Sequence, residues 1–259
     1  MLQASIWRAV PVELLFHRVY EMAEMMAAVV TGNWNPYEEI DWDTPEVTSC
    51  LTTFSKVSLL GHFCFAHIAI HERRRFRKDP VFVEIEFEHH AFERYKIPFL
   101  RFENFRRRDS PQIQIIEDDQ DAFYLWMLDQ EEAFEQLWER MTDEVLHLLF
   151  GNRGFLLEFN RELAEFRKKR GDSPSPRRAI PQWLKKAVYF RENGKCAFCK
   201  RDLSHLIAID AKQHYDHIVP LKELGANDPC NVQLLCDQCN LRKGSSPART
   251  SSIYQPWWE

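Results

Sequence analysis

The spacing of hydrophobic residues predicts a mainly helical chain up to about residue 170. Apolar residues recur at helical spacing through residues 10–31, and Gly32 is expected to end that helix. We interpret the methionines and aromatic residues in this stretch as core-packing residues. Residues 33–45 are predicted to form a loop. Further helices are expected from Pro45 to about Arg77, over residues 119–150, and from the glycine-containing break at 151–154 to the basic run at 167–170.

Two short stretches show the pattern of β-strands instead. Residues 81–88 alternate, with hydrophobic residues at the odd positions and glutamates at 84, 86 and 88. This alternation predicts a half-buried strand. Ile113 and Ile115 indicate a second short strand. The N-terminal part is therefore expected to be helical with a few strands.

Composition divides the chain near residue 171. Residues 171–181 are rich in proline, serine and glycine, which is typical of a linker. The net charge is −9 over residues 1–170 and +4 over residues 171–259. We therefore predict an acidic domain over residues 1–170, a linker at 171–181 and a mildly basic domain over 182–259. A short helix is expected at 181–192.

The composition also limits the class of protein. Hydrophobic residues make up 45% of the chain and charged residues 28%, as in a soluble globular protein. The richest apolar stretch, Val10 to Val30, contains several charged side chains, so we expect no membrane span. The first ten residues lack the pattern of a secretory signal. These features together predict a cytoplasmic protein.

Cysteine spacing predicts a metal site in the C-terminal domain. Four of the seven cysteines form two C-x-x-C pairs, and such pairs in a reducing compartment bind metal more often than they form disulfides. Four thiolates close a tetrahedral Zn²⁺ site with no open position, so this zinc is expected to be structural. The predicted ligands are Cys196, Cys199, Cys236 and Cys239. Cys230, Cys50 and Cys64 are interpreted as packed thiols.

Residue types between the two cysteine pairs suit phosphodiester hydrolysis. That reaction needs a general base for water and a cation near the scissile phosphate. In the run His-Tyr-Asp-His-Ile-Val-Pro-Leu at 214–221, His217 has the side chain for the base. Asp216 offers the oxygen ligands that Mg²⁺ or Mn²⁺ prefers. Adjacent strand residues point to opposite faces, so both can serve one site only where the strand ends, before Pro220.

The order of these pieces resembles the HNH endonuclease family over about residues 183–247. The pieces are C-x-x-C, D-H-I-x-P-L, N-x-Q-L-L and C-x-x-C-N-x-x-K-G. The resemblance implies a zinc-stabilised ββα-metal fold and cleavage of double-stranded DNA. It implies that Asp216 binds the catalytic metal, His217 is the base, and Asn231 orders the loop and orients the base. Asn240 stands where the family often has histidine and would be the second metal ligand, which gives a His-Asn-Asn pattern.

We therefore predict an α+β protein: a mainly helical N-terminal domain joined to a C-terminal HNH zinc module that acts as a metal-dependent endonuclease. Arg242 and Lys243 are the expected phosphate contacts, and RNA stays open as a substrate. The basic residues at 167–170 and 177–178 form either a solvated face or a further nucleic-acid contact. The alternative function is a catalytically weak nucleic-acid-binding module.

The role of residues 1–170 is left open between a sensor, an adaptor to a larger complex and an oligomerisation unit. The domain arrangement is similar to that of effectors in prokaryotic anti-phage or mobile-element systems. That similarity is one of architecture alone.

Overall fold

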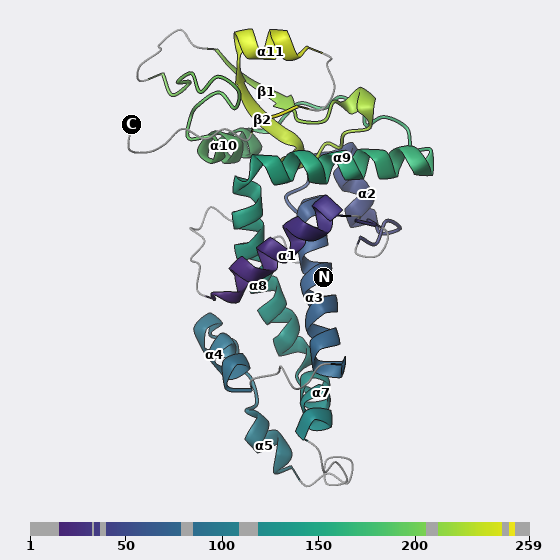
Figure 1. The fold of residues 1–259 in the computed structure, drawn as a ribbon, viewed down its shortest axis with the longest axis vertical. Helices are drawn as coiled ribbons and strands as arrows, with labels where there is room; N and C mark the ends of the chain where they lie inside the picture. The colour runs from purple at the N-terminus through teal and green to yellow at the C-terminus, as the bar shows by residue number, and fades with distance from the viewer. Residues whose placement is uncertain are drawn as a thin grey trace.

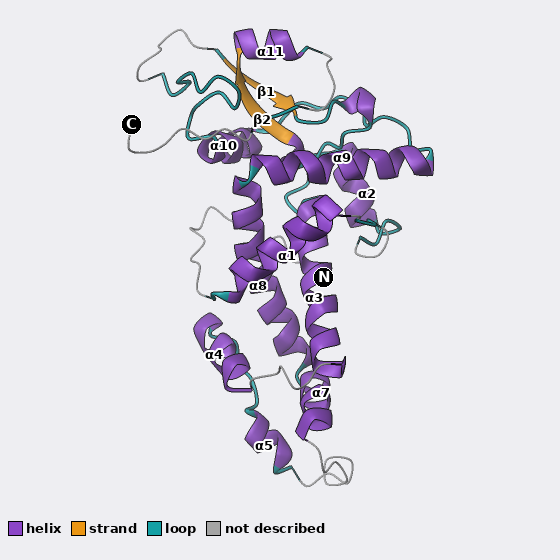
Figure 2. Ribbon diagram, in the orientation of Figure 1, coloured by secondary structure: helices purple, strands orange, loops and turns teal. Residues whose placement is uncertain are grey.

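The fold is described from a computed structural model, which describes residues 16–32, 34–36, 40–78, 85–108, 119–205, 212–244 and 249–251. The protein is mostly helical with one small two-stranded sheet, as the predicted fold class requires (Figure 2). Within the described ranges, no helix combines the length and the apolar character needed to cross a membrane.

Helices make up the described part of the chain before residue 171. They are α1 (Arg18–Gly32), α2 (Pro45–Thr52), α3 (Leu59–Lys78), α4 (Ile85–Tyr95), α5 (Phe102–Arg106), α7 (Asp119–Asp129), α8 (Glu131–Gly151) and α9 (Arg153–Arg170). The later elements are α10 (Gln182–Arg191), β1 (Gln213–His217), the 3₁₀ turns η2 (Leu221–Glu223) and η3 (Pro229–Asn231), β2 (Val232–Cys236) and α11 (Asp237–Lys243). The helices expected at 10–31, up to 170 and at 181–192 are present, although the first is described only from Arg18.

Two predicted long helices are each broken in the structure. The helix expected from Pro45 to Arg77 ends at Thr52, and the chain is not helical again until Leu59. Ser58 explains the restart, because its hydroxyl accepts the N–H of Gly61 and so caps α3. The helix expected over residues 119–150 breaks at Gln130, whose side-chain oxygen accepts the N–H of Leu100. The partner of Ser58 lies three residues away, whereas the partner of Gln130 is distant in sequence, so only the first break involves a local hydrogen bond.

The strand predicted at 81–88 is wrong for the part that the structure describes. Residues 85–88 form the first turn of α4, and residues 81–84 lie outside the described ranges. The segment forms a helix because helical spacing places the buried residues Glu88, His89, Ala91 and Phe92 together on one face of α4. The strand expected around Ile113 and Ile115 also lies outside the described ranges.

The main hydrophobic core lies between α1, α3, α8 and α9. Met22 and Met26 of α1 are fully buried in it, which confirms their interpretation as core residues. Trp34 stacks on Phe159 of α9 with ring centroids 5.1 Å apart. Cys50 and Cys64 are also buried in this core, as expected of packed thiols.

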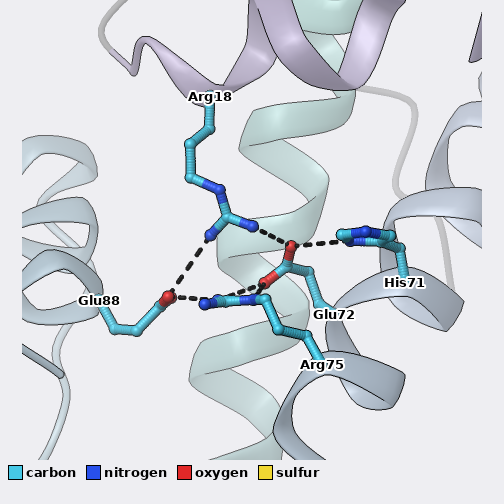
Figure 3. Close-up of polar contacts among 5 residues, drawn as sticks. All are labelled: Arg18, His71, Glu72, Arg75 and Glu88. Carbon is cyan, nitrogen blue, oxygen red and sulfur yellow. Dashed lines mark hydrogen bonds and ion pairs between the residues drawn. The ribbon is translucent and has the colours of Figure 1, made fainter. Parts of the chain in front are cut away.

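A buried charge cluster joins α1, α3 and α4 (Figure 3). Nη2 of Arg18 lies 2.6 Å from Oε1 of Glu72, and Nη2 of Arg75 lies 2.7 Å from Oε2 of the same carboxylate. Both guanidinium groups also pair with Glu88. Burial raises the pKa of Glu72, but His71 and the two arginines outweigh it and hold that pKa below its usual value. The cluster therefore holds both carboxylates between two cations in the interior.

The C-terminal module sits on one end of the helical part, with α9 lying across the ends of α3 and α8 and beneath the sheet (Figure 1). Ile218, Ala226 and Cys230 of the module belong to the core of the helical part. Oδ2 of Asp228 accepts the N–H of Leu59, the first residue of α3, at 2.7 Å. A second hydrophobic cluster, which includes Leu184, Val188 and Leu234, lies within the module. The division into domains at 171–181 stays a prediction.

Candidate active site and zinc site

Four cysteines gather at one end of the C-terminal module. The Sγ atoms of Cys196, Cys199, Cys236 and Cys239 all lie within 4.8 Å of one another. Sγ of Cys199 and Sγ of Cys236 are 3.6 Å apart, close to the roughly 3.8 Å expected between thiolates around tetrahedral Zn²⁺. The geometry therefore fits structural zinc. Cys230 is buried in the main core instead, as predicted for a packed thiol.

The four-cysteine cluster lies where a β-hairpin meets a helix. β1 and β2 are antiparallel, with Gln213 opposite Cys236 and His217 opposite Val232. α11 begins directly after Cys236, so the last residue of β2 and the first turn of α11 both carry zinc ligands. β1, β2 and α11 give the expected ββα order. β1 ends at His217, so Asp216 and His217 lie at the end of a strand, as expected for two adjacent residues that serve one site.

Asn231 organises the loop that follows β1. It is fully buried, its Oδ1 accepts the N–H of Val219 at 2.8 Å, and its Nδ2 donates to the carbonyl oxygens of Val219 and Ala226. A side chain at Gly225 would collide with the carbonyl oxygen of Val219, so the loop can close this tightly only around glycine. This geometry suits the loop-ordering role that was expected of Asn231.

His217 is half-buried where β1 ends. Burial lowers the pKa of its imidazole below the usual value, against the opposing effect of Asp216, so the ring is neutral at pH 7. Its Nε2 has no hydrogen-bond partner among the described residues. The ring stacks on Phe54, from the loop between α2 and α3, with centroids 6.0 Å apart and planes 23° apart. A residue of the N-terminal part thus lies against the predicted base.

Asp216 and Lys243 form an ion pair beside His217. Nζ of Lys243 lies 2.6 Å from Oδ2 of Asp216 and donates to the carbonyl oxygen of His217 at 2.8 Å. The lysine side chain is 1% exposed and that of Asp216 is 31% exposed. Lys243 therefore fixes the Asp216 carboxylate to α11. The ammonium group of Lys243, which was expected to contact phosphate, is therefore already paired with Asp216.

Asp216, His217 and Asn240 line the same open groove, whose volume is about 1190 Å³. The groove also includes His214, whose Nε2 has no hydrogen-bond partner among the described residues. Asn240 comes from α11 and the other three from β1. Asp216, His217 and Asn240, which were predicted to act together, therefore line one space.

Arg242 lies away from this groove. Its Nη2 donates to Sγ of Cys239 at 3.3 Å, so it neighbours the zinc thiolates. Sequence reasoning did not find the contact of Phe54 with His217 or the pairing of Lys243 with Asp216. Phe54 is distant in sequence from the motifs and gives no local signal. The sequence indicates the Asp216–Lys243 pair only weakly, because it shows only that an acidic and a basic residue both lie in the segment that carries the motifs.

Comparison with known proteins agrees with this geometry. Residues 196–246 match the family model described as HNH endonuclease. No curated protein and no solved structure matches the chain. The matched segment contains both cysteine pairs, β1, β2 and α11. On its family match and its four-cysteine site, the chain carries an HNH endonuclease domain at residues 196–246.

Proposed function

We propose that the protein is a metal-dependent endonuclease that hydrolyses phosphodiester bonds, with double-stranded DNA as the substrate. The observation that carries the proposal is the convergence of Asp216, His217 and Asn240 on one groove within a zinc-held hairpin and helix. A neutral imidazole with an unpartnered nitrogen is the acceptor that a general base requires.

Each side chain has a defined task in this reaction. His217 would take the proton from the attacking water, and Asn231 would hold the loop that fixes its backbone. Asp216 and Asn240 would hold a divalent cation through carboxylate and amide oxygens, which suit Mg²⁺ or Mn²⁺. When bound, such a cation stabilises negative charge that develops on the leaving oxygen. Lys243 would hold the Asp216 carboxylate in a fixed direction.

Plasmid cleavage tests the proposal. The zinc-loaded wild type is incubated with supercoiled plasmid in Mg²⁺, in Mn²⁺ and with chelator, beside His217→Ala and the control His147→Ala. His147 is exposed on α8, outside the groove lining. We expect metal-dependent cutting that falls at least about 100-fold in His217→Ala, in the range of general-base catalysis, and is unchanged in the control. Equal cutting by His217→Ala would refute the assignment of the base.

A second function is favoured by one observation, the ion pair of Lys243 with Asp216. Because the ammonium occupies Oδ2, only part of that carboxylate is free for a cation. The alternative is a nucleic-acid-binding module that cuts weakly or not at all. Wild-type protein that binds the plasmid and leaves it intact in every metal would support this alternative.

A further inference from the structure

The predicted linker is held in place by side chains from both parts of the chain. We define the connector as residues 173–180. Arg167 of α9 donates to the carbonyl oxygen of Ser173 at 2.8 Å and to Oγ of Ser175 at 3.1 Å. Nδ2 of Asn227 donates to the carbonyl oxygen of Pro176 at 2.7 Å. The connector is therefore a fixed segment with a defined position beside the active site.

The connector forms one wall of the groove that contains Asp216 and His217. Arg177 and Arg178 both line the groove, and both side chains are exposed. Arg178 makes one long hydrogen bond, from Nε to the carbonyl oxygen of Thr52 at 3.4 Å. Arg177 has no hydrogen bond or ion pair with a described residue. Both guanidinium groups thus keep most of their five donors available.

The groove is positively charged inside an acidic protein. Besides the two connector arginines, its described lining includes Lys185, Lys222 and Lys243. Asp216 is the one acidic residue among the described lining residues, and Lys243 pairs with it. The whole chain carries a net charge of −5, so this basic wall is a local feature. A concave, cationic surface concentrates polyanions.

The size of the groove indicates an extended polyanion. Its volume of about 1190 Å³ exceeds the 300–1000 Å³ typical of small-molecule sites. Arginine binds phosphate through a planar fork of donors, and neutralising backbone phosphates dominates nucleic-acid affinity. A single phosphate would use only part of this wall.

We propose that the connector is a nucleic-acid-binding wall of the active site, in which Arg177 and Arg178 bind backbone phosphates next to the bond that is cut. This inference rests on the proposed function. It places substrate contacts outside residues 196–246, the segment that matches the HNH family. The phosphodiester backbone that these arginines recognise is common to DNA and RNA.

The test compares two double variants that each remove two positive charges. Arg177→Gln/Arg178→Gln alters the connector. Arg94→Gln/Lys96→Gln is the matched control, because both side chains are exposed around the end of α4 and neither lines the groove. Both are made in full-length, zinc-loaded His217→Ala protein, so the probe stays intact. The readout is the anisotropy of a fluorescent DNA duplex, and in a second arm of a single-stranded RNA, over a series of salt concentrations.

We expect the connector variant to bind more weakly and to lose about two units of the slope of log K against log salt on duplex DNA, about one for each lost phosphate contact. The control should keep the wild-type slope. Binding in the RNA arm alone, with the same loss of slope, would support the wall and change the substrate. Equal slopes for the two variants would overturn the connector's role and leave the proposed endonuclease intact. If the parent His217→Ala protein binds neither probe, both proposals are overturned.

Discussion

Asp228 joins the HNH module to the helical part, and its environment makes that junction sensitive to pH. Its carboxylate is fully buried, with Oδ2 accepting the N–H of Leu59 and Oδ1 accepting the N–H of Cys230. Burial raises the pKa of Asp228 from 3.8 to about 6, although these two N–H groups act to lower it. Because the folded-state pKa lies above the unfolded one, folding favours the protonated form.

The sign and size of the effect follow from this shift. The stability that the protonated carboxyl contributes is fully present below about pH 4 and is lost as the pH rises through 6. A shift of about two units corresponds to about 3 kcal/mol over that whole window. About half of this is lost between pH 5 and 7.5. Asp228→Asn does not titrate, so this dependence on pH should vanish in the variant.

The assay is equilibrium urea unfolding of wild type and Asp228→Asn at several pH values, followed by circular dichroism. Zinc release at low pH affects both proteins, so the difference between their free energies of unfolding isolates the Asp228 contribution. We expect the wild type to lose about 1.5 kcal/mol relative to the variant between pH 5 and 7.5. Asp121→Asn serves as control, since Asp121 is exposed on α7. A difference that stays constant with pH would refute the reasoning.

Three further predictions concern the base, the zinc and the charge cluster. Phe54→Ala should lower kcat for plasmid cleavage several-fold with little change in KM, because stacking worth about 1 kcal/mol no longer orients His217. Phe54→Tyr should restore kcat. An unchanged kcat in Phe54→Ala would show that the ring contributes nothing. Removing zinc with a strong chelator should unfold the C-terminal module, measured as loss of amide-exchange protection in β2, while α8 stays protected. Glu72→Gln should destabilise the fold by about 3–5 kcal/mol in urea unfolding, because Arg18 and Arg75 keep one buried carboxylate between them; a loss below about 1 kcal/mol would contradict a buried, paired cluster.

The cysteine pairs and the Asp-His run could be predicted from sequence because their chemistry is local. Four cysteines in two C-x-x-C pairs have one simple closed arrangement around a metal, and the structure has it. The strand end at His217 followed from the need for two adjacent residues to serve one site. The predicted fold class was confirmed because the helical spacing of hydrophobic residues, which is also a local feature, persists over many residues in α1, α8 and α9.

Other features could not be predicted because they depend on distant residues. The alternation at 81–88 fits a strand by itself, but Glu88 meets Arg18 and Arg75 only when residues 85–95 are helical. The break before α3 likewise has a partner, Asp228, that lies 169 residues away in sequence. The spacing of hydrophobic residues reflects only the local preference for helix or strand. Here contacts with residues distant in sequence determined which of the two formed.

Residues 173–180, inside the predicted linker, are irregular in the structure and are held by side chains from both parts of the chain. Proline and serine prevent a helix at residues 173–180, yet they leave carbonyl and hydroxyl groups that Arg167 and Asn227 can bind. The division of the chain at residues 171–181 stays a prediction. Phe54 of the helical part stacks on the imidazole of His217, and the N–H of Leu59, at the start of α3, donates to Asp228 of the module. Both contacts therefore join the segment from Phe54 to Leu59 to the module that carries the proposed active site.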